Sequence, residues 1–111
     1  MDKIASFKAY DIRGKVPGEL NTELAYKIGR TFAKYLNAKL VVIGRDVRKS
    51  SPELSEALSI GLNDAGCDVF DLGLCGTEMI YFGTPFLNAD GGIMITASHN
   101  PSQYNGFKLC R

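Results

Sequence analysis

The segment LVVIGRDVRKSSPEL, residues 40–54, combines a strand pattern with the start of a helix. Leu40 to Ile43 is an apolar run rich in β-branched residues that stops at Gly44, as expected for a strand covered on both faces of a sheet. Ser50 and Glu53 then have capping-box spacing, and Pro52 suits a first helical turn. The segment therefore predicts a buried strand followed directly by a helix.

The same alternation continues on both sides of this segment. Apolar residues recur every fourth position after a cap at Asn21 or Thr22, which predicts an earlier helix, and Gly66 closes the later one. The other predicted elements are an extended piece within 1–18, an edge strand over 67–72, a short helix over 77–82, and strands over 93–95 and 107–109. Asn105-Gly106 is a turn signal before the last strand. The order predicts a three-layer α/β/α fold with a mostly parallel sheet and an antiparallel edge strand.

Size and charge exclude several classes of protein. The chain has 111 residues and a net charge of +1 without a block of like charge, so neither nucleic-acid binding nor a polybasic membrane patch is supported. The apolar runs are far shorter than the ~20 residues that cross a bilayer, and the N-terminus lacks a signal-peptide core, which indicates a cytoplasmic protein. Three scattered cysteines and one histidine favour reduced thiols over a zinc site or disulfides.

Ligands of such sheets bind outside the carboxyl ends of the strands, where three loops are expected over 44–50, 73–76 and 96–101. Arg45, Arg48 and Lys49 beside a helix N-terminus can attract phosphate or carboxylate. They can equally form a solvated cationic loop with Asp46 as local partner.

Ser98 follows a buried strand and precedes the turn residues Asn100 and Pro101. A serine at such a bend can project its hydroxyl as a nucleophile, or it can bond only to nearby backbone. His99 is adjacent in sequence, which disfavours a Ser–His acyl-transfer pair, and no GxSxG elbow is present.

Three motifs resemble one enzyme family. TASHNP at 96–101 with YNGFK at 104–108 is similar to the phosphoserine loop of the α-D-phosphohexomutases, and FKAYDIRG at 7–14 resembles their N-terminal signature. GRDVR at 44–48 with SSP at 50–52 matches in order and separation. The resemblance covers essentially the whole chain. GLCGTE at 73–78 is most similar to bacterial phosphomannomutases and bifunctional phosphomannomutase/phosphoglucomutases.

The resemblance implies a reversible transfer of phosphate between the 1- and 6-positions of a hexose phosphate, with mannose as the expected sugar. Ser98 is then the phosphoserine and one ligand of Mg²⁺, and a sugar 1,6-bisphosphate is the intermediate. Positioning and charge neutralisation supply most of the catalysis in phosphoryl transfer. A phosphoglucomutase, a phosphoglucosamine mutase and a non-enzymatic phosphate-binding module stay as alternatives, whereas the absence of GxGxxG after a strand disfavours a dinucleotide binder.

The resemblance also assigns roles to four further residues. Arg13 and Lys108 lie beside the phosphoserine, with electrostatic work expected for Arg13, and Tyr10 and His99 line the sugar side. For Lys108 the alternative is an exposed position on an edge strand, and for Tyr10 a ring packed under the serine loop.

Members of the family have four domains, so residues 1–111 correspond to an incomplete first domain. The magnesium loop, the sugar-selecting loop and the phosphate-binding C-terminal domain are the missing parts. We therefore expect the chain to be inactive alone and, with apolar surface and a strand edge uncovered, to self-associate.

Overall fold

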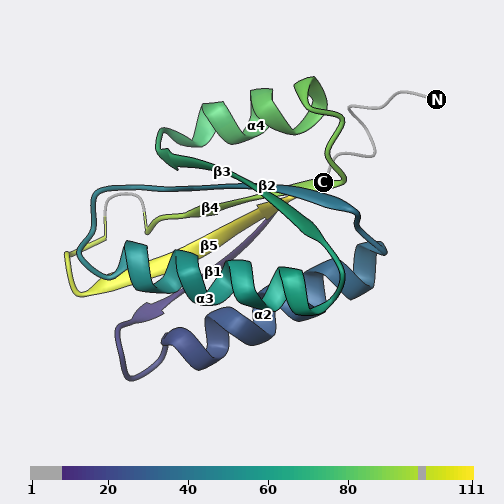
Figure 1. The fold of residues 1–111 in the computed structure, drawn as a ribbon. Helices are drawn as coiled ribbons and strands as arrows, with labels where there is room; N and C mark the ends of the chain where they lie inside the picture. Colours follow the sequence, from purple (N-terminus) through teal and green to yellow (C-terminus); the bar gives the residue numbers. More distant parts are fainter. Residues whose placement is uncertain (1–8, 98–99) are drawn as a thin grey trace.

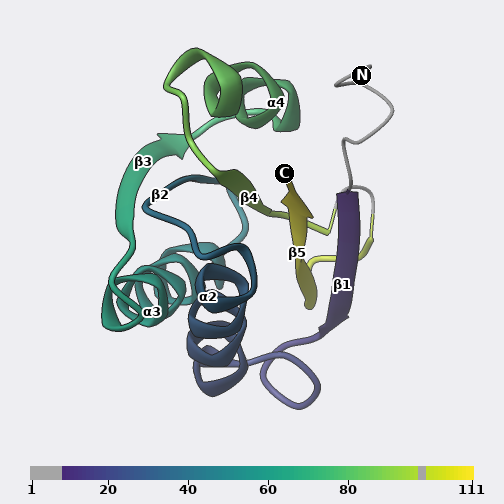
Figure 2. The same cartoon turned by 90° about the vertical axis from the view of Figure 1, so that its right-hand side faces the viewer.

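The computed structural model describes residues 9–97 and 100–111, which form three layers around a five-stranded sheet (Figure 1). Helices α2 and α3 cover one face of the sheet, and α4 covers the other (Figure 1, Figure 2). This arrangement confirms the predicted α/β/α architecture. The strands are β1 (Ala9–Lys15), β2 (Leu40–Arg45), β3 (Asp68–Leu74), β4 (Gly91–Ile95) and β5 (Tyr104–Cys110), and the helices are α2 (Thr22–Leu36), α3 (Ser51–Asp64) and α4 (Thr77–Phe86).

The strand order is β1-β5-β4-β2-β3. β2 is parallel to β3 and β4, whereas β5 is antiparallel to both of its neighbours. β5 is thus the antiparallel strand that the sequence predicts, but it lies inside the sheet rather than at the edge. The reason is that β1 pairs with β5 over its full length, from Ala9 opposite Cys110 to Lys15 opposite Tyr104. β3 lies at the other edge, as predicted.

The helix ends show which local signals operate. Asn21 caps α2 by accepting a hydrogen bond from the Leu24 amide at 2.9 Å, as predicted. The capping box at α3 is wrong, because the Ser50 side chain makes no cap hydrogen bond. α4 continues past its predicted end through Pro85 to Phe86. Proline removes one helical hydrogen bond, and this position so close to the helix end tolerates the loss.

The core is divided by the sheet. The larger part fills the space between the sheet and the helices α2 and α3, and the smaller part lies under α4 around Val42, Ile80 and Met94. α2 and α3 approach closely because each has a buried glycine at the crossing. A Cβ at Gly29 would be under 3.0 Å from the Leu58 carbonyl oxygen, and one at Gly61 would be under 3.0 Å from the Tyr26 carbonyl oxygen.

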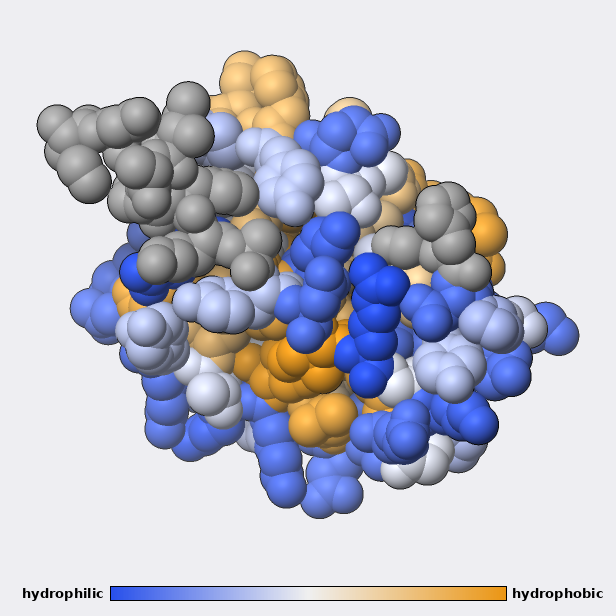
Figure 3. Space-filling view, turned by 180° about the vertical axis from the view of Figure 1, so that it is seen from behind, coloured by the Kyte–Doolittle hydropathy of each residue, from blue (hydrophilic) through white to orange (hydrophobic). Residues whose placement is uncertain are grey.

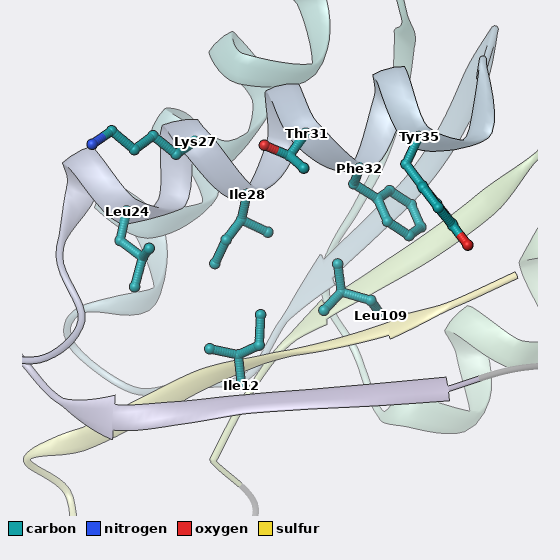
Figure 4. A pocket seen from close by; sticks show the side chains of 8 residues that line it. All are labelled: Ile12, Leu24, Lys27, Ile28, Thr31, Phe32, Tyr35 and Leu109. Carbon is teal, nitrogen blue, oxygen red and sulfur yellow. The ribbon is translucent and has the colours of Figure 1, made fainter.

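An apolar hollow lies between α2 and the strands β1 and β5. Figure 4 shows Leu24, Ile28 and Phe32 of α2 pointing down toward Ile12 and Leu109 of the strands. Figure 3 shows apolar surface in the centre of the molecule, seen from behind. Its lining residues are Ile12, Leu24, Lys27, Ile28, Thr31, Phe32, Tyr35 and Leu109. The hollow is the kind of uncovered apolar surface that the sequence predicts. Within the described ranges, no helix has the length and apolar character needed to cross a membrane.

Candidate functional site

The carboxyl ends of β2, β3 and β4 bring the three predicted loops to one rim of the sheet. The Asp46 amide donates to the Ile95 carbonyl at 3.1 Å, and the Cys75 amide donates to the Arg45 carbonyl at 3.1 Å. These two bonds join the start of the first loop to the ends of the neighbouring strands. Topology alone therefore assembles the rim, as expected for a parallel arrangement.

The serine motif lies at this rim, although Ser98 and His99 themselves are outside the described residues. The residues that flank them are well held. Thr96 and Ala97 are buried, the Thr96 amide donates to the Gly106 carbonyl at 2.9 Å, and the Asn100 amide donates to the Ala97 carbonyl at 3.0 Å. The start of the motif is thus bonded to β5, and Asn100 is bonded back to Ala97 across the Ser98-His99 pair.

Arg13 reaches these flanks from β1. Its Nη1 donates to Asn100 Oδ1 at 2.9 Å and to the Ala97 carbonyl at 3.4 Å, while Nη2 lies 3.7 Å from a carboxylate oxygen of Asp11. One third of the Arg13 side chain is exposed. The structure therefore brings Arg13 to both residues that border Ser98 and His99.

Lys108 lies on the same face of the sheet as Arg13. It is opposite Asp11 on β1 and Met94 on β4, and Met94 packs under α4. Because side chains alternate along a strand, Asp11, Arg13 and Lys108 all point to the α4 side. The alternative of an exposed lysine on an edge strand is wrong, since β5 is interior and Lys108 is half-buried.

Tyr10 is not brought together with these cations. It is opposite Leu109, whose side chain belongs to the core under α2, so Tyr10 points to the α2 side of the sheet. There it is 57% exposed and borders a second apolar hollow, which Ile12 and Tyr35 also line.

The Arg48 side chain is mostly buried and paired with Asp46, whereas its neighbours Val47 and Lys49 are exposed. Its Nε donates to Asp46 Oδ2 at 3.2 Å, so the predicted pairing with Asp46 is present. Its Nη atoms donate to the carbonyls of Asn100, Pro101 and Tyr104 at 2.9, 2.9 and 3.1 Å. The guanidinium thus joins the first loop to the segment that follows the serine motif. Arg45, by contrast, is paired with β3: its Nη1 lies 3.9 Å from Asp71 Oδ1.

Asn105 belongs to the site, although the sequence pattern predicts a turn at this position. It lies within β5 and is fully buried, so Asn105-Gly106 is not a turn. Its Nδ2 donates to the hydroxyls of Ser50 and Ser51 at 2.8 and 3.0 Å. Gly106 is needed because a Cβ there would meet the Ile12 carbonyl oxygen of β1. The signal that could have revealed Asn105 is an amide side chain in a segment of otherwise alternating strand pattern.

The cysteines are free thiols, as predicted, and burial raises the pKa of each of them. The largest change is at Cys110, whose pKa burial raises to about 11. Burial, together with the nearby Cys110 and Asp11, also raises the pKa of the Tyr81 phenol. These groups therefore stay protonated at neutral pH and do not act as nucleophiles there.

The described residues contain no group of three or more His, Cys, Asp or Glu side chains that could hold a metal ion. Asp11 is connected to the serine motif through Arg13, with which it is paired.

Comparison with known proteins agrees with this architecture. Residues 5–111 match the family model described as phosphoglucomutase/phosphomannomutase, alpha/beta/alpha domain I. The chain therefore belongs to the phosphoglucomutase/phosphomannomutase family.

Among its relatives, a phosphomannomutase of Salmonella typhimurium is 57% identical over all 111 residues, and a protein of Xanthomonas campestris named phosphohexose mutases is 58% identical over 97% of the chain. A crystal structure of a phosphoglucomutase/phosphomannomutase family protein from Burkholderia thailandensis matches 93% of the chain at 41% identity with a TM-score of 0.84. The chain spans 24% of the length of both named relatives and 25% of that structure.

Proposed function

We propose that this chain is the phosphoserine-bearing part of a phosphohexomutase that interconverts mannose 1-phosphate and mannose 6-phosphate. The observation that carries the proposal is the placement of Arg13, which donates to Ala97 and Asn100 on either side of the Ser98-His99 pair. Family membership and relatives named phosphomannomutase support the reaction class and the sugar.

In the proposed reaction, phosphorylated Ser98 gives its phosphoryl group to the free hydroxyl of the sugar phosphate. The bond from phosphorus to Ser98 Oγ breaks as the bond to the sugar oxygen forms, and the proton of the sugar hydroxyl is relayed to Ser98 Oγ, which leaves as a neutral hydroxyl. A sugar 1,6-bisphosphate results. After it reorients, its other phosphoryl group returns to Ser98 Oγ, and the serine proton is relayed to the sugar oxygen that departs. Lys108 is the group that we assign to proton transfer.

Arg13 contributes charge rather than a proton. An arginine stays protonated in proteins, so it can neutralise phosphoryl oxygens throughout the transfer. Catalysis of phosphoryl transfer depends mostly on such positioning and electrostatic stabilisation. The pairing of Arg13 with Asp11 at 3.7 Å keeps the guanidinium oriented toward the motif.

The proposal leaves the other parts of the site to other segments. We propose that Mg²⁺ takes its carboxylate ligands from outside this chain, because the described residues offer no cluster of them. The chain alone is then inactive. A phosphate-binding module built on Arg48 is disfavoured, because Arg48 already donates to three backbone carbonyls.

The test joins the chain to the remaining three quarters of the Salmonella phosphomannomutase, in place of the segment that it matches. We expect this chimera to convert mannose 1-phosphate when primed with the 1,6-bisphosphate, and mass spectrometry to find phosphate on the Ser98 peptide. A chimera with Ser98→Ala and the isolated chain should both be inactive. Full activity of the Ser98→Ala chimera would overturn the proposal.

The sugar needs a separate measurement, because the Salmonella segment brings its own preference. The gene product that contains this chain should be assayed with mannose, glucose and glucosamine 1-phosphates. The highest kcat/KM on mannose 1-phosphate supports the assignment. A higher value on either other sugar replaces it with phosphoglucomutase or phosphoglucosamine mutase.

A further inference from the structure

Arg48 makes a set of contacts that the proposed chemistry does not use. Its Nε donates once, to Asp46, its Nη1 donates twice, to Pro101 and Tyr104, and its Nη2 donates once, to Asn100. At least four of the five N–H donors of this arginine are therefore directed at protein acceptors. Only 12% of the side chain is exposed. Such a guanidinium is directed toward the protein rather than toward a ligand.

The guanidinium is itself held from the α3 side. Asp46 Oδ1 accepts from the Arg48 amide at 3.1 Å and from the Ser51 hydroxyl at 2.9 Å, while its Oδ2 accepts from Arg48 Nε. Ser51 in turn accepts from Asn105 of β5. Asp46, Arg48, Ser51 and Asn105, hereafter the loop clamp, thus connect the start of α3 to both ends of the segment 100–105.

Asn100 is held from two directions. Its side-chain oxygen accepts from Arg13 of β1, and its backbone carbonyl accepts from Arg48. The residue that follows His99 is therefore fixed relative to both β1 and α3. Charge-assisted hydrogen bonds of this kind are stronger than neutral ones, and a planar guanidinium fixes geometry as well as distance.

We propose that Arg48 is a positioning residue for phosphoryl transfer: through the carbonyls of Asn100, Pro101 and Tyr104 it sets the place of the serine motif relative to Arg13 and Lys108. The inference rests on the proposed function of Ser98. Misplacement of a reacting group by about 1 Å can cost on the order of a hundredfold in rate. Arg48 therefore controls the rate of transfer without contacting the sugar.

The first measurement uses the 111-residue chain. Amide hydrogen exchange is followed by NMR in the parent and in Arg48→Met, Arg48→Lys, Leu58→Ala and Lys39→Met. We expect Arg48→Met to accelerate exchange at residues 100–106 selectively, by about tenfold or more relative to β2, with Arg48→Lys intermediate. Leu58→Ala creates a cavity in the core and should accelerate exchange without this selectivity. Lys39→Met removes an exposed charge at the other end of β2 and should change nothing.

The second measurement uses the active chimera. We expect Arg48→Met to lower kcat per folded molecule by about tenfold or more, which corresponds to about 1.4 kcal/mol of barrier, while KM for the sugar phosphate changes little. Arg48→Lys should restore part of kcat. Leu58→Ala should lower the folded fraction but not kcat per folded molecule.

The outcomes separate the two proposals. If the parent chimera transfers phosphate and Arg48→Met keeps its kcat, or loses activity only in proportion to the unfolded fraction, the positioning role is refuted and the function of Ser98 stands. An inactive parent chimera without phosphate on Ser98 refutes the function, and with it the catalytic purpose of the clamp. Unchanged exchange at residues 100–106 in Arg48→Met refutes the clamp in either case.

Discussion

The crossing of α2 and α3 predicts that two glycines cannot accept a methyl group. In most helices, replacing glycine with alanine stabilises the protein, because alanine has the higher helix propensity. At Gly29 and Gly61 the new Cβ would instead meet backbone atoms of the facing helix at distances under 3.0 Å. Backbone atoms move only with their whole helix. Each variant must therefore push α2 and α3 apart.

The size of the effect follows from two opposing contributions. The propensity gain is up to about 1 kcal/mol. Overpacking typically costs about 1–3 kcal/mol, and a clash with backbone belongs to the upper part of this range. We expect Gly29→Ala and Gly61→Ala each to lower the free energy of unfolding by about 1–2 kcal/mol, a fall in Tm of about 5–15 °C for a domain of this size.

The assay is thermal and urea unfolding followed by circular dichroism. Gly83→Ala in α4 is the matched control, because its Cβ would meet only side chains, at 3.6 and 3.7 Å. That variant should be stabilised by about 0.5–1 kcal/mol. The double variant Gly29→Ala/Gly61→Ala should cost less than the two single costs added, since one displacement relieves both contacts. Single variants as stable as Gly83→Ala would refute the reasoning.

Three further predictions concern stability, thiol chemistry and association. Asn105→Leu should lower the free energy of unfolding by about 2–4 kcal/mol. It removes the hydrogen bonds to Ser50 and Ser51 and the side-chain acceptor of the buried Gly106 amide. A loss below about 0.5 kcal/mol in urea unfolding contradicts the buried network. Because burial raises the pKa of Cys110 from 9.0 to about 11, its contribution to stability is complete below pH 9 and is lost as the pH rises toward 11. Cys110→Ala should reduce this alkaline loss, and an identical pH profile for the two proteins contradicts the assignment. The chain should self-associate through its apolar hollow, and Ile12→Asp should weaken association in sedimentation velocity runs, whereas a monomeric parent at high concentration contradicts this expectation.

The strands and helices were predictable where one local signal dominates. Three such signals act within a few residues: the apolar run before Gly44, the Asn21 cap, and Gly66 after α3. Gly66 has a φ of +84°, which glycine adopts without strain. The loops then gather at one rim because parallel strands require it. The order of strands and helices along the sequence therefore predicts which loops lie together.

The errors came from contacts between distant residues. Ser50 makes no cap hydrogen bond because its backbone is helical, with φ −80° and ψ −12°, and its hydroxyl accepts instead from Asn105, 55 positions away. The Asn105-Gly106 pair looked like a turn because nothing local reveals that β1 packs against Gly106. Arg48 looked like a phosphate ligand because its carbonyl acceptors are more than fifty residues distant. Local pattern cannot identify such partners.

The candidate site was predicted unevenly for the same reason. Arg13 and Lys108 were selected by resemblance, and the register of β1 against β5 places both on one sheet face. Tyr10 came from the same motif, but strand alternation points it to the opposite face. Alternation places Tyr10 and Arg13 on opposite faces of β1 in any register, and the register against β5 decides which of the two shares a face with Lys108.

The strand order has a consequence for how the chain is made. β1 is synthesised before the other four described strands and β5 after them, and β5 is the strand with which β1 pairs. During translation β1 therefore has no partner until residues 104–110 have been made, while β2, β3 and β4 can already associate with α2 and α3. Pairing between the two ends of a sequence is slow, because a long loop must close before any contact forms. Arg13 is thus held beside the serine motif only after β1 has paired with β5, and a nascent chain exposes the apolar face of β1 until this pairing forms.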